Sequence, residues 1–359
     1  KQLPLDNNKG VCVLTHTNVA INEITERLGD KSKILFKYPN YFGTIQSFVD
    51  KYLAIPAYAH YFKKRPLRID NEIYYEQVEK SLISLGGPAK NWLDRQRDPL
   101  EKLKEIRFSL EDFDNLVQGL NGDLCLINRD SPTFKGLKEF KLNLMESGIL
   151  CFDDAYSLAY RYLRDFPQLK NVFSERFAIV LIDEMQDTDK HQEDLLHKLF
   201  NERVIIQKIG DNNQAIFSST VKDNVWNVNE DCLTITNSKR FSNSIARIVN
   251  KVCLAPHEEL KGLDSIPEIK PKLLLFNDSS IDKVLKTFGD LIFKYNLQEC
   301  KRNIYKAVGW VGKPKENKYT IQSYWNNYSR EEQHRKNDFN SLASYLQTKD
   351  DELIKNEGA

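Results

Sequence analysis

Two adjacent carboxylates follow a short apolar run near the middle of the chain. Residues 177–182 read FAIVLI, and Asp183 and Glu184 come directly after them. An uninterrupted apolar run of this length predicts a buried strand of a parallel sheet, whose carboxyl end faces solvent. One carboxylate there can hold Mg²⁺, and a second can orient the water that attacks a nucleoside triphosphate. The alternative is a solubilising or helix-capping role, and the pair alone does not choose between them.

Several other predicted strands also end in polar side chains. Residues 11–15 and 203–209 predict two of these strands, and a third ends close to residue 44. The polar residues at their ends are His16, Thr17, Asn18, Thr44 and Asp211. The carboxyl ends of parallel strands meet at one edge of a sheet, which is where ligands bind. Several such ends in one α/β sheet favour a nucleotide site over the capping alternative.

Length, charge and cysteine use restrict the class of protein. The chain has 359 residues, which predicts two or three domains. It carries 52 Lys and Arg against 51 Asp and Glu, so any contact with nucleic acid requires a local basic patch. Six cysteines without a C-x-x-C pair predict reduced thiols in a cytoplasmic protein. No apolar stretch approaches the ~20 residues that span a bilayer, so we expect no membrane partner.

The pattern of apolar residues predicts four segments. Residues 1–60 and 149–265 alternate strands and helices and form the two parts of a first α/β domain. Residues 61–148 lack that alternation, look largely helical and contain the basic cluster KKRPLR, which predicts an inserted helical domain. Residues 266–359 begin a further domain, with a helix at 281–295 and a strand at 303–312. A helix that starts after residue 151 is expected to be capped by Asp153 or Asp154.

Five segments resemble, in order, the motifs of superfamily 1 helicases of the UvrD/Rep type. LIDEMQDT resembles D-E-x-Q-D-[TS], and VLTHTNVAINEITERL resembles the segment that begins T-F-T-N. GTIQSF, IGDNNQAIF and LTITNSKRFSNSI resemble three further motifs, and together the five cover about residues 11–250. The resemblance implies an α/β fold: a RecA-like P-loop NTPase parallel sheet with a helical insertion, followed by the start of a second RecA-like domain.

The resemblance also implies roles at the ATP site. Asp183 would hold Mg²⁺, and Glu184 would orient and activate the attacking water. Asp211 and Gln214 would contact the nucleotide, Gln214 as the sensor of the γ-phosphate. Arg240 would stabilise charge on the transferred phosphoryl group, a role that suits a fixed guanidinium.

A second set of residues is assigned to DNA by the same resemblance. These residues are His16, Thr17, Asn18, Thr44, Gln46 and Phe217. Local capping bonds are the alternative for the hydroxyl groups among them. His16 stands where the family has a base-stacking Phe, and Gln46 stands where it has a His. Phe217 and Trp226 are candidates for a stacking aromatic that the family has after the QAIF segment.

The function that the resemblance implies is an ATP-dependent DNA helicase or translocase. It would use ATP and Mg²⁺ and move 3′ to 5′ on single-stranded DNA, for example in DNA repair. The alternative is a helicase-like ATPase subunit that senses nucleic acid and regulates a partner nuclease, in phage defence or recombination, without unwinding DNA.

Two elements of the family pattern are not found in this sequence. It contains no G-x-x-x-x-G-K-[ST] phosphate loop and none of the late motifs of the second motor domain. A degenerate helicase is one explanation. Such a protein would not be expected to keep Asp183, Glu184, Gln214 and Arg240 together, so we expect the chain to be part of a longer protein.

Overall fold

The computed structural model describes residues 8–120, 122, 123, 126, 128–214, 232–253, 259–299, 304–309, 318–326 and 328. The chain divides into two compact units, Lys1–Leu233 and Thr234–Ala359. The first unit is mixed α/β and is built on a four-stranded parallel sheet. The division into four domains that the sequence predicts stays a prediction.

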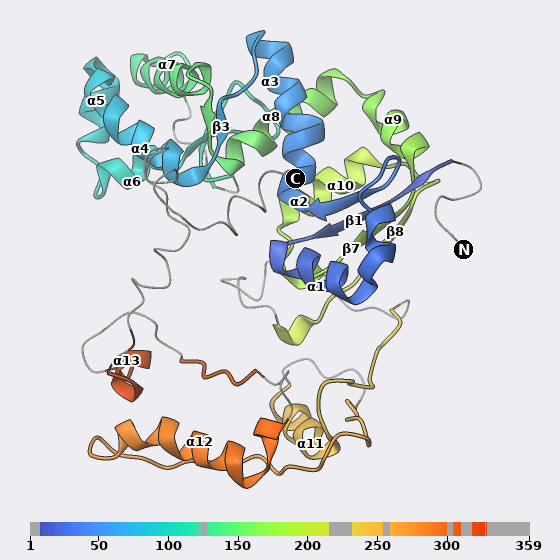
Figure 1. Ribbon diagram of the computed structural model, residues 1–359. Coiled ribbons are helices and arrows are strands. Elements are labelled where there is room, and N and C mark those ends of the chain that lie inside the picture. Colours follow the sequence, from blue (N-terminus) through green and yellow to red (C-terminus); the bar gives the residue numbers. More distant parts are fainter. Residues whose placement is uncertain are drawn as a thin grey trace, which may run out of the picture. The chain divides into compact units, whose positions relative to one another are not determined.

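The sheet of the first unit has the strand order β2-β1-β7-β8. Its strands are β1 (Gly10–Thr15), β2 (Tyr41–Thr44), β7 (Phe177–Ile182) and β8 (Ile205–Lys208). All three neighbouring pairs are parallel, and the register sets Leu14 opposite Ile182 and Ile182 opposite Lys208. The four carboxyl ends therefore lie at one edge, and β7, which precedes Asp183, is central as predicted (Figure 1).

Helices pack against this sheet, and all but the first of them contribute side chains to one of two apolar cores. They are α1 (Asn18–Leu28), α2 (Ile45–Val49), α8 (Phe152–Asp165), α9 (Leu169–Arg176) and α10 (Lys190–Leu199). The sheet contributes Cys12, Leu14 and Val180 to the core, and the helices contribute Phe48 and Leu195, among others. Strands β1 and β7 read as nearly continuous apolar runs because both faces of a central parallel strand are covered.

Residues between α2 and α8 form a second core of their own. Its elements are α3 (Ile55–Phe62), β3 (Arg68–Ile69), α4 (Asn71–Ser81), α5 (Gly87–Leu93), α6 (Pro99–Lys104), β4 (Ile106–Phe108), β5 (Leu116–Gln118), α7 (Pro132–Glu146) and β6 (Ile149–Leu150). Helices supply most of this segment, and two small sheets, β3-β6 and β4-β5, complete it. We call residues 55–151 the inserted segment.

Helix α8 joins the two cores. Tyr156 and Ala159 pack in the sheet core, whereas Leu158 packs in the core of the inserted segment. Its N-cap is Cys151 rather than Asp153 or Asp154, so the predicted cap was wrong. The reason is that Asp154 reaches back from the first turn to the N–H of Cys151 in a capping box.

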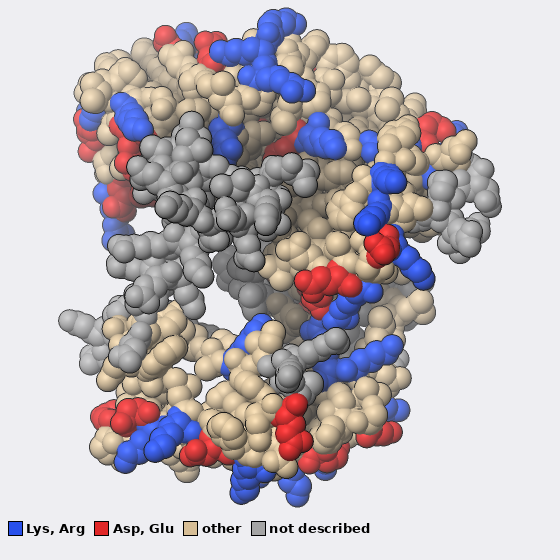
Figure 2. Space-filling model, in the orientation of Figure 1, with Lys and Arg blue, Asp and Glu red and all other residues tan. Residues whose placement is uncertain are grey.

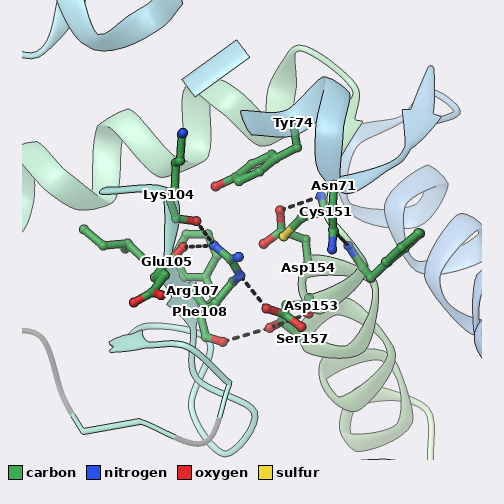
Figure 3. A network of polar contacts seen from close by, with 12 residues as sticks. Asn71, Tyr74, Lys104, Glu105, Arg107, Phe108, Cys151, Asp153, Asp154 and Ser157 are labelled. Atoms are coloured by element: carbon green, nitrogen blue, oxygen red, sulfur yellow. Dashed lines mark hydrogen bonds and ion pairs between the residues drawn. The ribbon is translucent and has the colours of Figure 1, made fainter. Parts of the chain in front are cut away.

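The two carboxylates at the start of α8 pair with cations of the inserted segment. Asp153 accepts a hydrogen bond from Arg107 Nε at 2.8 Å (Figure 3). Asp154 is fully buried and lies 2.7 Å from Nζ of Lys141, which also donates to Tyr74 Oη at 2.6 Å. These pairs hold the inserted segment to the helix that supports the sheet.

The second unit contains α11 (Asn243–Val252), α12 (Val284–Lys294) and α13 (Ile321–Tyr324). The helix predicted at 281–295 is confirmed by α12 and the 3-10 turn Ile281–Lys283 before it. Residues 304–309, expected in a strand, adopt no strand. Among the described residues of this unit no strand is formed, and a second RecA-like domain stays a prediction.

The sequence predicts reduced cysteines and no membrane-spanning segment, and the described residues bear on both predictions. Cys12 and Cys151 are buried free thiols, and Cys232 and Cys253 are half-buried free thiols, whereas Cys125 and Cys300 lie outside the described residues. No helix within the described ranges has both the length and the apolar content to cross a bilayer.

Candidate functional site

Asp183 and Glu184 lie at the carboxyl end of the central strand. The N–H of Asp183 donates to the carbonyl of Leu14 at 2.9 Å, which extends the pairing of β7 with β1 by one residue. On the other side, Met185 N–H donates to the carbonyl of Ile209, beyond the end of β8. The acidic pair is therefore held between the ends of both neighbouring strands.

The backbone turns sharply at Glu184. Its φ of 54° and ψ of 45° are left-handed, a conformation that few residues other than glycine adopt. A 3-10 turn, Met185–Asp187, follows at once and buries Met185. The change of direction therefore falls directly after Asp183, at the carboxyl end of β7.

Asp183 is half-buried and has a raised pKa. Burial is the main cause, and the negative charge of Glu184 adds to it, while a hydrogen bond from the backbone of Glu184 opposes it. A carboxylate in this state gains from a nearby cation, which would restore the charged form.

A chain of hydrogen bonds links Glu184 to Gln214. Gln186, which is 5% exposed, donates to Glu184 Oε2 at 2.5 Å and accepts from the N–H of Asp211 at 2.9 Å. Gln214 Nε2 in turn donates to Asp211 Oδ2 at 2.8 Å. The structure thus brings together Glu184, Asp211 and Gln214 of the predicted ATP site. Gln186 was missed as a member, although it stands inside the quoted acidic motif.

The polar side chains at the carboxyl edge of the sheet are of the types that bind Mg²⁺ and a nucleotide. Mg²⁺ is usually held by one or two carboxylates, with waters and substrate phosphates completing its shell. Asp183 can supply such a ligand, and among the described residues no larger cluster of metal ligands competes with it. Thr15 Oγ1 and Asn212 Oδ1 are buried beside the same strand ends and have no hydrogen-bond partner among the described residues. They are polar groups that a ligand could satisfy.

Arg240 belongs to the second unit. Its side chain is exposed, and its backbone N–H donates to Ser238 Oγ at 3.1 Å, in the connection that leads into α11. Its assignment to the phosphoryl group stays a prediction.

The hydroxyl groups assigned to DNA both cap helices. Thr17 accepts from the N–H of Ala20 and caps α1, while Thr44 accepts from the N–H of Ser47 and caps α2. Thr17 and the adjacent Asn18 are exposed and Thr44 is half-buried, so capping leaves room for a further contact. Their contact with DNA stays a prediction. Phe217 and Trp226 lie outside the described residues.

His16 makes a hydrogen bond that spans 172 residues of sequence. Its Nε2 lies 2.8 Å from Thr188 Oγ1, just after the 3-10 turn that follows Glu184. Burial lowers the pKa of His16, although the charges of Asp187, Asp189, Glu184 and Asp183 act in the opposite direction. The imidazole is therefore neutral near pH 7.

Gln46 is engaged with a carboxylate whose pKa is raised. Gln46 Nε2 donates to Asp50 Oδ1 at 2.7 Å, one turn later in the same helical run. Burial raises the pKa of Asp50 to about 6, and the bond from Gln46 only partly offsets it. At neutral pH the folded protein therefore keeps an ionised carboxylate in a place that disfavours the charge.

We expect Asp50→Asn to raise the melting temperature at pH 7. The folded pKa of about 6 lies above the value of about 3.9 in an unfolded chain, so the ionised carboxylate lowers stability progressively as pH rises between these values. Thermal unfolding of both proteins at pH 7 and below about pH 3 checks this, since the group is neutral in both states at the lower pH. An equal difference at the two pH values would contradict it.

Comparison with known proteins places these residues in a family context. A family model described as "UvrD/REP helicase N-terminal domain" matches residues 5–221. A probable DNA helicase II homolog of Mycoplasma capricolum is 25% identical over 85% of this chain and 40% of its own length. The Gabija protein GajB of Bacillus cereus is 19% identical over 70% of the chain and 42% of its own length.

Shorter similarities point to the same family. The ATP-dependent DNA helicase Rep of Buchnera aphidicola subsp. Schizaphis graminum is 31% identical over 23% of this chain and 12% of its own length. The chain spans about two fifths of the length of the first two relatives. Their names therefore refer to proteins longer than the sequence that matches them.

Proposed function

Because the chain belongs to the UvrD/REP helicase family, we propose that the protein is an ATP-dependent DNA helicase that moves 3′ to 5′ on single-stranded DNA. The observation that carries the proposal is the position of Asp183 and Glu184 at the end of a central strand, where backbone bonds from Asp183 and Met185 reach both neighbouring strand ends. This is the edge at which parallel α/β sheets bind ligands.

In this proposal residues at the sheet edge of the first unit bind ATP. Asp183 would hold Mg²⁺, which when bound neutralises charge on the phosphates. Glu184 accepts a proton from the attacking water and fixes its orientation. Gln214 and Asp211 contact the nucleotide and, through Gln186, remain linked to Glu184. Arg240 would stabilise charge on the transferred phosphoryl group.

DNA would lie along the carboxyl ends of β1 and β2. Thr17, Asn18 and Thr44 stand at those ends and can donate to phosphates. His16 lies in the connection after β1, and Gln46 lies in the first turn of α2. Because the net charge is only +1, a local cationic surface is also required.

The exposed cations after α3 could supply that surface. Lys63, Lys64, Arg65 and Arg68 are all exposed, and Lys and Arg side chains gather over the end of α3 at the top of the view (Figure 2). The alternative for this cluster is a solvated turn.

We expect the double substitution Lys63→Gln and Arg65→Gln to weaken single-strand binding and its dependence on salt. Each lost phosphate contact should reduce the slope of log affinity against log salt by about 0.7. Fluorescence titration with an oligodeoxythymidylate at several salt concentrations measures the slope. Lys135→Gln, an exposed lysine on α7, is the control and should leave it unchanged. Equal slopes for the wild type and the double variant would show that the cluster is a solvated turn that does not contact DNA.

A second candidate function is a nucleic-acid-sensing ATPase subunit that regulates a partner nuclease. The observation that favours this candidate is the similarity to the Gabija protein GajB, whose name does not describe a helicase. A strand-displacement assay separates the two. A helicase releases the short strand of a partial duplex with a 3′ overhang when ATP is present, and fails on a 5′ overhang. ATP hydrolysis without release from either substrate would favour the sensor.

A further inference from the structure

The hydrogen bond between His16 and Thr188 links two loops of the sheet edge. In the proposed function one of these loops contacts DNA and the other carries Glu184 of the ATP site. His16 lies in the short connection between β1 and α1, on the side proposed for DNA. Thr188 ends the 3-10 turn that begins after Glu184, on the side proposed for ATP. Its N–H donates to Met185, and its side chain is 5% exposed.

Both partners are held firmly by their own surroundings. On one side, β1 ends at Thr15 and Thr17 caps α1, so His16 has little freedom to move independently of α1. On the other side, Asp187 N–H donates to the carbonyl of Glu184, and Asp189 begins α10 with a capping box. A displacement of the β1–α1 connection would therefore be transmitted to the turn that carries Glu184.

We propose that His16 is a positioning residue that couples DNA contact at the β1–α1 connection to the orientation of Glu184, acting through its hydrogen bond to Thr188. This inference rests on the proposed ATPase and DNA-binding function. It differs from base stacking, because the atom that acts is the ring nitrogen Nε2. A phenylalanine at this position could stack on a base but could not form the bond.

The position of Glu184 explains why such a contact would matter. Its left-handed backbone is unfavourable for a residue with a side chain and persists only where the surroundings enforce it. The strand pairing fixes the turn at its start, through Asp183. The bond to His16 fixes it at its end, through Thr188. Loss of the second restraint leaves the fold intact but allows the turn to relax.

The test compares the intact wild-type protein with two variants. Thr188→Val keeps the shape of the side chain and removes the hydroxyl, whereas Thr188→Ser keeps the hydroxyl. The readout is the ratio of kcat for ATP hydrolysis with saturating oligodeoxythymidylate to kcat without it. We expect Thr188→Val to lower this ratio about fivefold or more, a usual size for coupling between sites. Thr188→Ser should retain the ratio, and KM for ATP should be unchanged in both.

A double-mutant cycle isolates the bond itself. His16→Phe should lower the ratio as Thr188→Val does, and the double variant should be no lower than either single, since all three lack the same interaction. His16→Gln, whose amide can donate or accept a hydrogen bond, should restore part of the lost stimulation by DNA. Melting curves of each variant identify any that fail to fold, and if Thr188→Val is among them, His16→Phe carries the comparison with the wild type.

The outcomes separate this inference from the proposed function. A wild-type protein whose ATP hydrolysis does not respond to DNA would overturn both. A wild-type response that Thr188→Val preserves in full, or losses that add in the double variant, would overturn the coupling and leave the proposed function standing.

Discussion

Glu184→Gln in the intact protein is expected to bind ATP as the wild type does and to hydrolyse it on the order of 10²-fold more slowly. The amide keeps the size of the side chain and can still take part in the bond with Gln186. It cannot accept a proton from water, which is the step assigned to Glu184. Steady-state hydrolysis and equilibrium binding of a fluorescent ATP analogue measure the two effects separately.

Glu202→Gln is the matched control for this substitution. Glu202 is exposed in the turn between α10 and β8, so the same loss of charge occurs in the same unit away from the sheet edge. Its hydrolysis rate should equal that of the wild type. A wild-type rate in Glu184→Gln would remove Glu184 from the chemistry, and loss of ATP binding would assign it a structural role instead.

Lys141→Ala is expected to lower the free energy of unfolding by about 3–5 kcal/mol, the usual cost of leaving one partner of a buried ion pair alone. Lys141 and Asp154 are 1% and 0% exposed. Burial is the largest single effect and disfavours the charged lysine, but Asp154, Tyr74 and Cys151 together outweigh it and the pKa of Lys141 is raised. The substitution leaves Asp154 charged, buried and without its cation.

Urea unfolding of the intact protein measures this loss. Lys138→Ala on the same helix is the control, because Lys138 pairs with the exposed Asp114, and surface pairs contribute about 0–1 kcal/mol. Replacing both members of the buried pair, as Lys141→Met with Asp154→Leu, should recover most of the stability. Similar losses for Lys138→Ala and Lys141→Ala would show that the buried pair does not hold the inserted segment to α8.

The sheet could be predicted from sequence because its signals are local. The runs that precede Thr15 and Asp183 are apolar throughout, as strands covered on both faces must be, and polar residues follow them immediately. Parallel strands align their carboxyl ends, so the chemistry of separate segments could be assigned to one edge. Gln186 could have been added by the same reasoning, since it lies two residues beyond Glu184.

Contacts between distant segments could not be predicted in this way. Nothing in the spacing of His16 and Thr188 indicates that their side chains meet, because that contact depends on how two turns leave adjacent strands. The start of α8 gave a similar error. Either Asp153 or Asp154 is a good cap by type, yet the partners Arg107 and Lys141 lie in the inserted segment and require both carboxylates inside the first turn.

The strand expected at residues 303–312 shows a different limit. Alternating apolar residues such as Ile304 and Val308 predict a strand only when a neighbouring strand pairs with them. The described residues of the second unit include an isolated bridge between Asn237 and Lys261, and Ile304 and Val308 are 80% and 95% exposed. Strand propensity was present, but no pairing partner is seen among those residues.

Hydrolysis of ATP by the intact protein, measured with and without single-stranded DNA and with and without Mg²⁺, tests the central claim most directly. We predict Mg²⁺-dependent hydrolysis that single-stranded DNA stimulates and that Asp183→Asn abolishes, because Asp183 lies at the proposed magnesium position at the end of β7. Hydrolysis that Asp183→Asn leaves unchanged, or no hydrolysis by the wild-type protein under any of these conditions, would contradict the assignment of this sheet edge as an ATP site.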